Sequence, residues 1–420
     1  WWSTPYSWDN QFLTGFSHVN LSGVGCPELG VILLMPTTGK VEANPQKYGS
    51  IISNQKAKAG LYSCFLDKYN VKAEATATLR TGISRYTFPK GQSNLLINLG
   101  LGLTNEKGAK IRIVNNREVE GSRMTGTFCY NDNTERPVYF VVRLSKPADS
   151  FGVWKKMPPM KAEAAWSKTA DKYKYYNGYR AEIFGDDVGA YFSFSTTENE
   201  QIIAEVGISY VSIANARENL AAESNNFNFE ATKQNAWQTW NNQLQPIQVF
   251  GGSSDEKSIF YTALYHMNIH PNILNDVNGQ YPRMGGFEIK NTTESNRYTV
   301  FSLWDTYRNF HPLMTLLYPN LQLDFVKSMI AMYKESGWLP KWELNGRETY
   351  TMNGDPALPV IADTYLRGVK NFDVETAYRA MKKHALTPDS LNKIRKDNDF
   401  YLKHGYVPYR KQYDNSVSEA

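Results

Sequence analysis

Tryptophans and carboxylates crowd two stretches of the sequence, YTVFSLWDTYRNFHPL (298–313) and GWLPKWELNGRETYTMNGDPALPVIADTYLRG (337–368). A tryptophan ring offers a flat apolar face to the axial hydrogens of a pyranose. A carboxylate accepts hydroxyl protons through charge-assisted hydrogen bonds, and paired carboxylates can do acid and base work on a glycosidic bond. The candidate sugar contacts in these stretches are Trp304, Asp305, Arg308, Trp342, Glu343 and Asp355.

These residues also have a purely structural interpretation. The Trp-Asp-x-x-Arg spacing fits a buried ion pair of Asp305 and Arg308 that braces a core. Trp338 and Trp342 have the i, i+4 spacing of one helix face, and the Asn-Gly dipeptides of the second stretch fit plain turns. The density of polar and aromatic residues near expected helix ends and loops favours the sugar site over packing alone.

Histidines give weaker signals. His266 and His270 have an i, i+4 spacing on an expected helix, which can bind zinc, but Met267 stands where the metalloprotease motif has a glutamate. A packing role is therefore favoured for both. His18, in the expected turn-rich loop GFSHVNLSG (15–23), fits a ligand contact and a structural role equally well.

The two halves of the sequence have different periodicities. Residues 1–230 contain short β-branched and aromatic runs separated by Gly, Asn and Pro, which predicts a β-sandwich larger than an immunoglobulin domain. Residues 231–250 are expected to form a helical linker, and residues 251–420 have the 3.6-residue period of helices. Strands followed by helices indicate a multidomain β-then-α chain rather than an alternating α/β fold.

Composition excludes several classes of protein. The 420 residues carry 46 Lys and Arg against 41 Asp and Glu, and the basic residues are scattered, which argues against nucleic acid as a partner. No apolar run approaches the roughly 20 residues of a membrane span. Cys26, Cys64 and Cys129 allow one disulfide at most, so a disulfide-built scaffold is excluded and the compartment stays open.

Several long motifs, in order along the chain, resemble glycoside hydrolase family 92, the calcium-dependent exo-acting α-mannosidases. The motifs that carry this resemblance are GFSHVNLSG (15–23), LLMPTTG (33–39), TATLRTGISRYTFP (76–89), FSLWDTYRNFHPL (301–313), WLPKWELNGRET (338–349) and GDPALPVIADTY (354–365). The match covers nearly the whole chain.

The resemblance implies an N-terminal β-supersandwich (1–230), a helical linker (231–250) and the N-terminal part of an (α/α)6 barrel (251–420). It implies removal of terminal mannose, α-1,2-linked in N-glycans or mannans, with inversion. It further implies Ca²⁺ bound to the mannose hydroxyls, a role that suits a hard ion with oxygen ligands. The implied location is periplasmic, cell-surface or secreted.

For individual residues, the resemblance carries a sugar-contact role to Trp304 and Asp305, and further to Arg308, Trp342, Glu343 and Asp355. It places the site between the two domains, where His18 is expected to approach the sugar from the sandwich side.

The family's general acid and base motifs do not occur in this sequence. Both are expected beyond Ala420, together with most calcium ligands, so the catalytic residues and metal ligands stay unassigned and the isolated chain is expected to be inactive. A second chain or a C-terminal portion is expected to complete the barrel. Two alternatives stay open: a carbohydrate-binding fragment without activity, and another inverting (α/α)6 hydrolase or phosphorylase.

Overall fold

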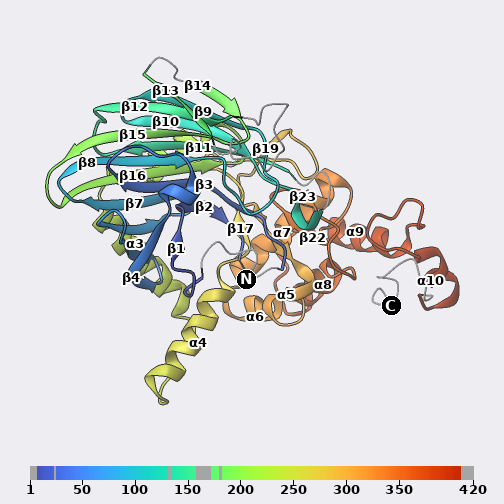
Figure 1. The fold of residues 1–420 in the computed structure, drawn as a ribbon. Helices are drawn as coiled ribbons and strands as arrows, with labels where there is room; N and C mark the ends of the chain where they lie inside the picture. The colour runs from blue at the N-terminus through green and yellow to red at the C-terminus, as the bar shows by residue number, and fades with distance from the viewer. Residues whose placement is uncertain (1–6, 23–24, 131–134, 158–171, 179–181, 408–420) are drawn as a thin grey trace. The chain divides into compact units, whose positions relative to one another are not determined.

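The computed structural model of the protein divides into two units, Trp1–Gln248 and Val249–Ala420. It describes residues 7–22, 25–130, 135–157, 172–178 and 182–407. The first unit is rich in antiparallel strands and the second is mainly helical, as Figure 1 shows. The predicted order of a β-rich domain followed by a helical domain is thereby confirmed, whereas the (α/α)6 barrel stays a prediction.

Two antiparallel sheets make up most of the first unit. The ten-stranded sheet has the order β1 (Phe12–Leu13), β4 (Ser50–Lys58), β5 (Leu61–Leu66), β6 (Val71–Ala77), β7 (Thr81–Phe88), β16 (Glu200–Ser209), β11 (Pro137–Leu144), β10 (Glu118–Met124), β9 (Ala109–Asn115) and β14 (Glu182–Gly185). The six-stranded sheet has the order β13 (Tyr173–Asn177), β12 (Ser150–Lys156), β15 (Val188–Thr196), β8 (Gly91–Asn98), β3 (Leu29–Thr38) and β2 (Phe16–Asn20).

One hydrophobic core joins side chains from both sheets. Tyr86 and Phe88 of β7 are buried, as are Trp154 of β12 and Phe192 of β15, and all four belong to this core. Because side chains alternate between the two faces of a strand, Tyr86 and Phe88 lie on one face of β7. Fully burying such a side chain contributes about 1.5–3 kcal/mol, so these four rings help to stabilise the sandwich.

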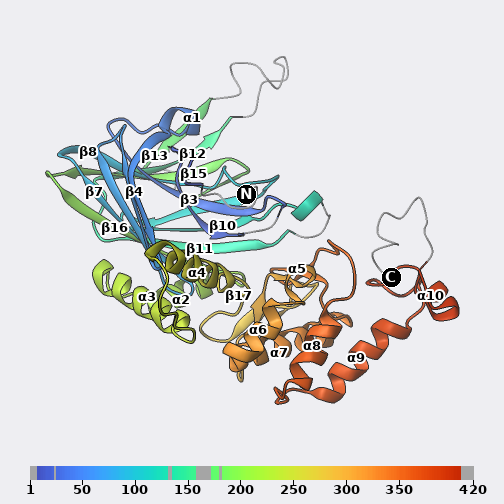
Figure 2. The same cartoon turned by 90° about the horizontal axis from the view of Figure 1, so that it is seen from below.

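Helices α2 (Ile213–Glu223) and α3 (Phe229–Leu244) lie against the ten-stranded sheet in the first unit (Figure 2). Helix α1 (Pro45–Tyr48) is a single turn that precedes β4. Ala216 and Leu220 of α2 pack on Val141 of β11. The Arg85 guanidinium of β7 lies 4.3 Å from the centroid of the Phe229 ring, so a cation–π contact ties the start of α3 to the sheet.

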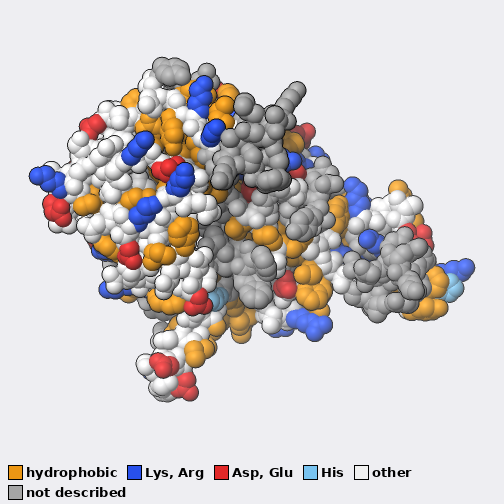
Figure 3. Space-filling view, in the orientation of Figure 1, with side chains coloured by type: hydrophobic (Ala, Val, Ile, Leu, Met, Phe, Trp, Pro, Cys, Tyr) orange, Lys and Arg blue, Asp and Glu red, His pale blue; other side chains and the backbone are white. Residues whose placement is uncertain are grey.

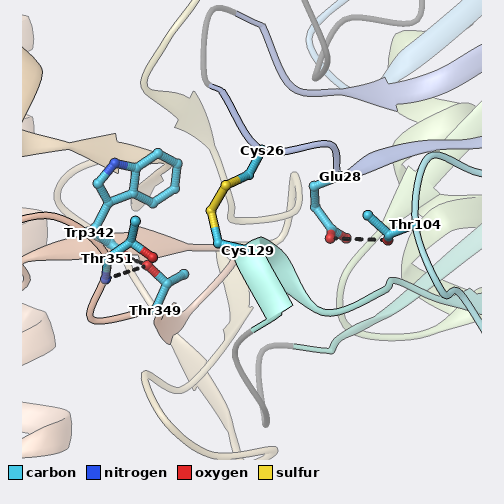
Figure 4. Close-up of a disulfide and its surroundings, with 7 residues drawn as sticks. All are labelled: Cys26, Glu28, Thr104, Cys129, Trp342, Thr349 and Thr351. Atoms are coloured by element: carbon cyan, nitrogen blue, oxygen red, sulfur yellow. Dashed lines mark hydrogen bonds between the residues drawn. A yellow bond between two sulfur atoms is a disulfide. The ribbon is translucent and has the colours of Figure 1, made fainter.

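One disulfide, Cys26–Cys129, closes a long loop in the first unit (Figure 4). The two cysteines are 103 residues apart in the sequence. Cys64 is free and buried. The single disulfide that three cysteines allow is therefore present.

The second unit combines seven helices with small two- and three-stranded sheets in its described part. Its helices are α4 (Ser254–Met267), α5 (Leu303–Thr306), α6 (Phe310–Leu317), α7 (Pro319–Ser336), α8 (Ala357–Leu366), α9 (Val374–Leu386) and α10 (Asn398–His404). Its strands are β17 (Asn272–Ile273) with β20 (Tyr298–Thr299), β18 (Gln280–Pro282) with β19 (Ile289–Asn291), and β21 (Phe301–Ser302) with β22 (Trp342–Leu344) and β23 (Arg347–Glu348).

Helix α7 provides the centre of the second core. Phe325 and Met329 of α7 are buried together with Ile361 of α8 and Ala380 of α9. The helix ends at Gly337, whose φ of 82° is the left-handed conformation that glycine adopts without steric cost. None of the helices in the described part of the chain is long and apolar enough to cross a membrane.

Three local predictions are wrong. His18 lies on strand β2 instead of in a loop. His270 does not share a helix with His266, because α4 ends at Met267. Pro271 follows His270, and a residue before proline is disfavoured in the helical conformation. Trp342 lies on β22, so it shares no helix face with Trp338.

Candidate functional site

A three-stranded sheet, β21–β22–β23, organises the two tryptophan-rich stretches. Ser302 of β21 is opposite Trp342 of β22, and the Thr349 amide donates a hydrogen bond to the Trp342 carbonyl at 3.1 Å. The two-residue turn between β22 and β23 is Asn345-Gly346, with φ values of 51° and 78°. Asn-Gly suits this position because tight hairpin turns of this kind need positive φ at both residues.

Glu343 lies at the centre of this sheet and is fully buried. Its carboxylate accepts hydrogen bonds from the Thr299 hydroxyl at 2.7 Å, the Val300 amide at 3.0 Å and the Gly346 amide at 2.5 Å. Burial raises the pKa of Glu343 to about 7, although these hydrogen bonds and the charge of Arg297 oppose the shift. A buried carboxyl with this pKa is half-protonated near neutral pH.

Glu348 accepts hydrogen bonds from three backbone amides at one end of the sheet. Its carboxylate accepts hydrogen bonds from the amides of Lys341 at 2.8 Å, Trp342 at 2.9 Å and Tyr350 at 2.9 Å. Burial raises the pKa of Glu348 despite these three bonds. The side chain thereby fixes the segment that enters β22 and the segment that leaves β23.

Trp342 is 1 % exposed, so neither face of its ring is open to a sugar in this structure. The Thr349 hydroxyl donates to the Trp342 carbonyl at 2.8 Å. Trp342 and Glu343 were predicted as sugar contacts, but their burial favours a supporting role.

Trp304 and Asp305, on the short helix α5, are exposed, and Trp304 is 44 % accessible. The Ser302 hydroxyl donates a hydrogen bond to Asp305. Arg308 is also exposed and donates from Nε to the Tyr307 hydroxyl at 2.6 Å. No ion pair joins Asp305 to Arg308 in the described part of the chain, and both are exposed, so the buried-brace interpretation is wrong.

Asp355 belongs to a separate polar network. Its carboxylate accepts hydrogen bonds from His384 Nδ1 at 3.0 Å and Arg395 Nε at 2.9 Å. His384 Nε2 accepts the Leu339 amide hydrogen at 2.9 Å, which leaves Nδ1 as the donor to Asp355. Burial alone would raise the pKa of Asp355, but His384 and Arg395 outweigh it and hold that pKa below its usual value.

His18 is held inside the first unit. Its Nδ1 lies 2.8 Å from the Ile32 carbonyl, and burial lowers its pKa. A Cβ at Gly82 would lie 2.7 Å from the imidazole Cδ2, so the ring rests directly on that glycine. A sugar-contact role for His18 stays a prediction.

Two sets of residues were missed. In the second unit, Tyr350 and Met352 are exposed and have positive φ values of 54° and 66°. The Asn-Gly dipeptides on either side of them fit plain turns, and no local pattern distinguishes this segment from a turn. In the first unit, burial and the charge of Glu106 raise the pKa of Glu28 to about 7. Glu28 accepts a hydrogen bond from the Gly126 amide at 3.1 Å and from Thr104 (Figure 4).

Metal ions are held by several ligand groups placed close together. No group of three or more His, Cys, Asp or Glu residues in the described part of the chain is placed to hold an ion. Calcium ligands are therefore not assigned to these residues, and no step is derived through the ion.

Both halves of the sequence match one family. Residues 1–209 match the glycosyl hydrolase family 92 N-terminal domain, and residues 215–420 match the glycosyl hydrolase family 92 catalytic domain. The chain belongs to glycoside hydrolase family 92. The family resemblance deduced from the motifs is thereby confirmed.

Solved structures of family 92 share this fold. A family 92 α-mannosidase from Bacteroides thetaiotaomicron, solved in complex with mannoimidazole, is 30 % identical with a TM-score of 0.85, covering 97 % of this chain and 52 % of that chain. A family 92 inverting mannosidase from Bacteroides thetaiotaomicron VPI-5482 is 23 % identical with a TM-score of 0.79. The match covers 90 % of this chain and 49 % of that chain.

A curated relative comes from a fungus. An "uncharacterized secreted glycosidase" of Arthroderma benhamiae is 24 % identical over 408 residues, covering 90 % of this chain and 46 % of the relative. The chain thus spans about half the length of the relatives that it matches.

Proposed function

We propose that the protein acts on glycans with terminal α-linked mannose, and that Trp304 and Asp305 bind the terminal sugar. The complete reaction is hydrolysis with inversion in the presence of Ca²⁺, and α-1,2-linked mannose of N-glycans or mannans is the substrate. Family membership supports the reaction class. The observation that carries the site is the exposed Trp304–Asp305 pair, in which the carboxylate has no cationic partner among the described residues.

The chemistry of this pair suits a hexose. An exposed indole face can cover the apolar side of a sugar ring, while a carboxylate accepts hydroxyl protons. The Ser302 hydroxyl orients Asp305 from one side without neutralising its charge. Arg308 is held by Tyr307 and is assigned a neighbouring, weaker contact.

The buried carboxylates are unsuited to acid catalysis in this structure. Glu343 has a pKa of about 7, which is suitable for a general acid, but it is fully enclosed and its oxygens are occupied by three donors. A general acid must come within hydrogen-bonding distance of the leaving-group oxygen. The family's acid and base motifs are also absent from this sequence, so we expect the 420-residue chain to bind mannose without turnover.

Binding can be measured with methyl α-mannoside by ligand-observed NMR on the purified chain. Replacing Asp305 with Asn keeps the shape and removes the charge. Hydrogen bonds to charged groups contribute about 1.5–3 kcal/mol, so affinity should fall by about 10- to 100-fold. Asp255→Asn is the matched control, because Asp255 is also an exposed first-turn carboxylate beside a serine.

Unchanged affinity in Asp305→Asn, with a melting temperature lowered by several degrees, would show that Asp305 is a structural residue. It would remove Trp304 and Asp305 from the site. Release of mannose from an aryl α-mannoside at ordinary glycosidase rates would instead show that a carboxylate of this chain performs acid catalysis.

Two rival functions make different predictions. A binding fragment without activity binds mannose and gives no product even when the family's acid and base are supplied by a longer or second chain. A phosphorylase releases sugar phosphate and needs inorganic phosphate. Product analysis with and without phosphate separates these functions from calcium-dependent hydrolysis to free mannose.

We further propose an extracytoplasmic location, periplasmic, cell-surface or secreted. Disulfides persist mainly in oxidising compartments, and this chain has the Cys26–Cys129 bond. The name of the curated relative, which includes the word secreted, points the same way.

A further inference from the structure

Two chain segments leave the β21–β22–β23 sheet at the end where a third segment enters it. Ser302, Trp342 and Thr349 form one row across the three strands, because Ser302 is opposite Trp342 and Thr349 donates to the Trp342 carbonyl. Beyond this row, the chain leaves β21 toward Trp304 and leaves β23 toward Tyr350. Both departures are at one end because β22 runs antiparallel to both of its neighbours.

The distance between the two departing segments follows from strand geometry. β21 and β23 lie on opposite sides of β22, so their ends are two strand spacings apart, about 10 Å. Two consecutive sugars of a glycan can fill a separation of this size, with one ring beside each segment.

Tyr350 has features of a ligand contact. Its side chain is 47 % exposed, and its hydroxyl has no hydrogen-bond partner among the described residues. Its backbone has a φ of 54°, which is unfavourable for a bulky side chain. Such unfavourable conformations persist when the surroundings impose them, and they concentrate at functional sites.

Glu348 imposes this conformation. Its Oε1 accepts the amide hydrogens of both Trp342 and Tyr350, at 2.9 Å each, while Oε2 accepts that of Lys341 at 2.8 Å. The Tyr350 backbone is thereby tied to the start of β22. The Lys341 side chain donates a hydrogen bond to the Ile394 carbonyl at 3.5 Å.

We propose that Tyr350 contacts the sugar next to the terminal mannose, and that Glu348 is the positioning residue that presents Tyr350 to it. The proposal rests on the assignment of the terminal mannose to Trp304 and Asp305. Tyrosine supplies an aromatic face for the second ring and a hydroxyl for its polar edge. Tyr350 therefore favours disaccharides over monosaccharides.

The test compares two ligands on the purified chain, methyl α-mannoside and α-1,2-mannobiose. Tyr350→Ala should lower the affinity for the disaccharide by about tenfold and leave that for the monosaccharide unchanged. Tyr350→Phe keeps the ring and removes the hydroxyl, so it should lose only part of the preference. Tyr378→Ala, which removes an exposed tyrosine of α9, is the control and should change neither affinity.

The role of Glu348 needs a readout that general destabilisation would not move. Glu348→Gln should lower the preference for the disaccharide in the wild-type background. In the Tyr350→Ala background the same change should have no further effect on that preference, because both act through one contact. If the two effects add, Glu348 does not act through Tyr350. If Glu348→Gln fails to fold, the Tyr350 variants still decide the contact.

The outcomes also separate this inference from the proposed function. In one outcome both sugars bind the wild-type chain and Asp305→Asn weakens binding, but Tyr350→Ala leaves the disaccharide preference intact. That outcome overturns only the inference on Tyr350. An equal loss of affinity for both ligands in Tyr350→Ala also contradicts the inference on Tyr350. If neither sugar binds the wild-type chain, both proposals are overturned.

Discussion

Two tryptophan–carboxylate pairs, Trp304–Asp305 and Trp342–Glu343, look alike in the sequence and differ in the structure. The first pair is exposed at the start of a short helix. The second is 1 % and 0 % exposed, on the central strand of a three-stranded sheet. A flat ring beside a carboxylate can therefore meet a ligand only where the fold leaves both open to solvent.

The partners of the two carboxylates explain the difference. Asp305 accepts a hydrogen bond from a neighbouring serine, whereas Glu343 accepts one from Thr299, 44 residues earlier in the chain. A carboxylate whose donors come from distant segments holds those segments together. Glu343 thus supports the region that presents Trp304 and Asp305, and the two pairs can be separated experimentally.

The largest expected effect is a difference in the free energy of unfolding between alanine variants of the two tryptophans. Trp342→Ala should lower the free energy of unfolding by about 3–5 kcal/mol, because it removes a fully buried ring. Trp304→Ala should lower it by much less, because 44 % of that side chain is exposed, while weakening binding of methyl α-mannoside. Denaturant unfolding and ligand-observed NMR measure both quantities. Comparable losses of stability in the two variants would contradict the comparison.

A smaller effect concerns the protonation of Glu343. Its pKa is about 7 in the folded chain and near 4.5 in the unfolded chain, so the folded state binds the extra proton between these values. The free energy of unfolding should therefore fall as pH rises from 5 to 7.5, by at most about 3 kcal/mol from this group.

Glu343→Gln should remove this share of the pH dependence. Unfolding in urea at pH 5 and 7.5, compared with wild type, measures it. Burial also raises the pKa of Glu28, in the first unit, to about 7. Glu28→Gln should therefore reduce the pH dependence of the free energy of unfolding in the same direction. A slope that is unchanged in Glu343→Gln would show that Glu343 is ionised throughout this range.

The smallest expected effect has the opposite sign and concerns Asp355. Its pKa is depressed in the folded chain, so its ionised form stabilises the fold above the unfolded value of about 3.8. That contribution is lost as pH falls through the folded pKa. Asp355→Asn should lower stability at pH 7 by about 1.5–3 kcal/mol, the scale of a hydrogen bond to a charged group, and by less at pH 3. Melting curves at the two pH values measure the difference, and an equal loss at both would contradict an ionic role.

Long periodic segments were predictable from the sequence. Helices α7 and α9, of 18 and 13 residues, lie in the half of the sequence that has the helical period. The β-rich first half was also recognisable, since its strands are five to ten residues long in most cases and alternate in polarity.

The small sheet in the second unit was not predictable by the same means. Its strands have two or three residues, which is too short for a period of two to show. The Asn345-Gly346 turn was a usable hairpin signal that was interpreted as a plain turn. The burial of Glu343 depends on Thr299, and no local pattern reveals that pairing.

The Cys26–Cys129 bond also keeps the chain covalently connected after some proteolytic cuts. In the chain-entropy treatment, a loop of this length destabilises the unfolded state by about 4–5 kcal/mol. More practically, strands β3 to β10 lie between the two cysteines. A single cut in any turn among them leaves the two pieces covalently joined. The nicked protein would run as one band on a gel without reductant and as two bands with it, so a cleaved molecule could keep its sandwich in a protease-rich medium.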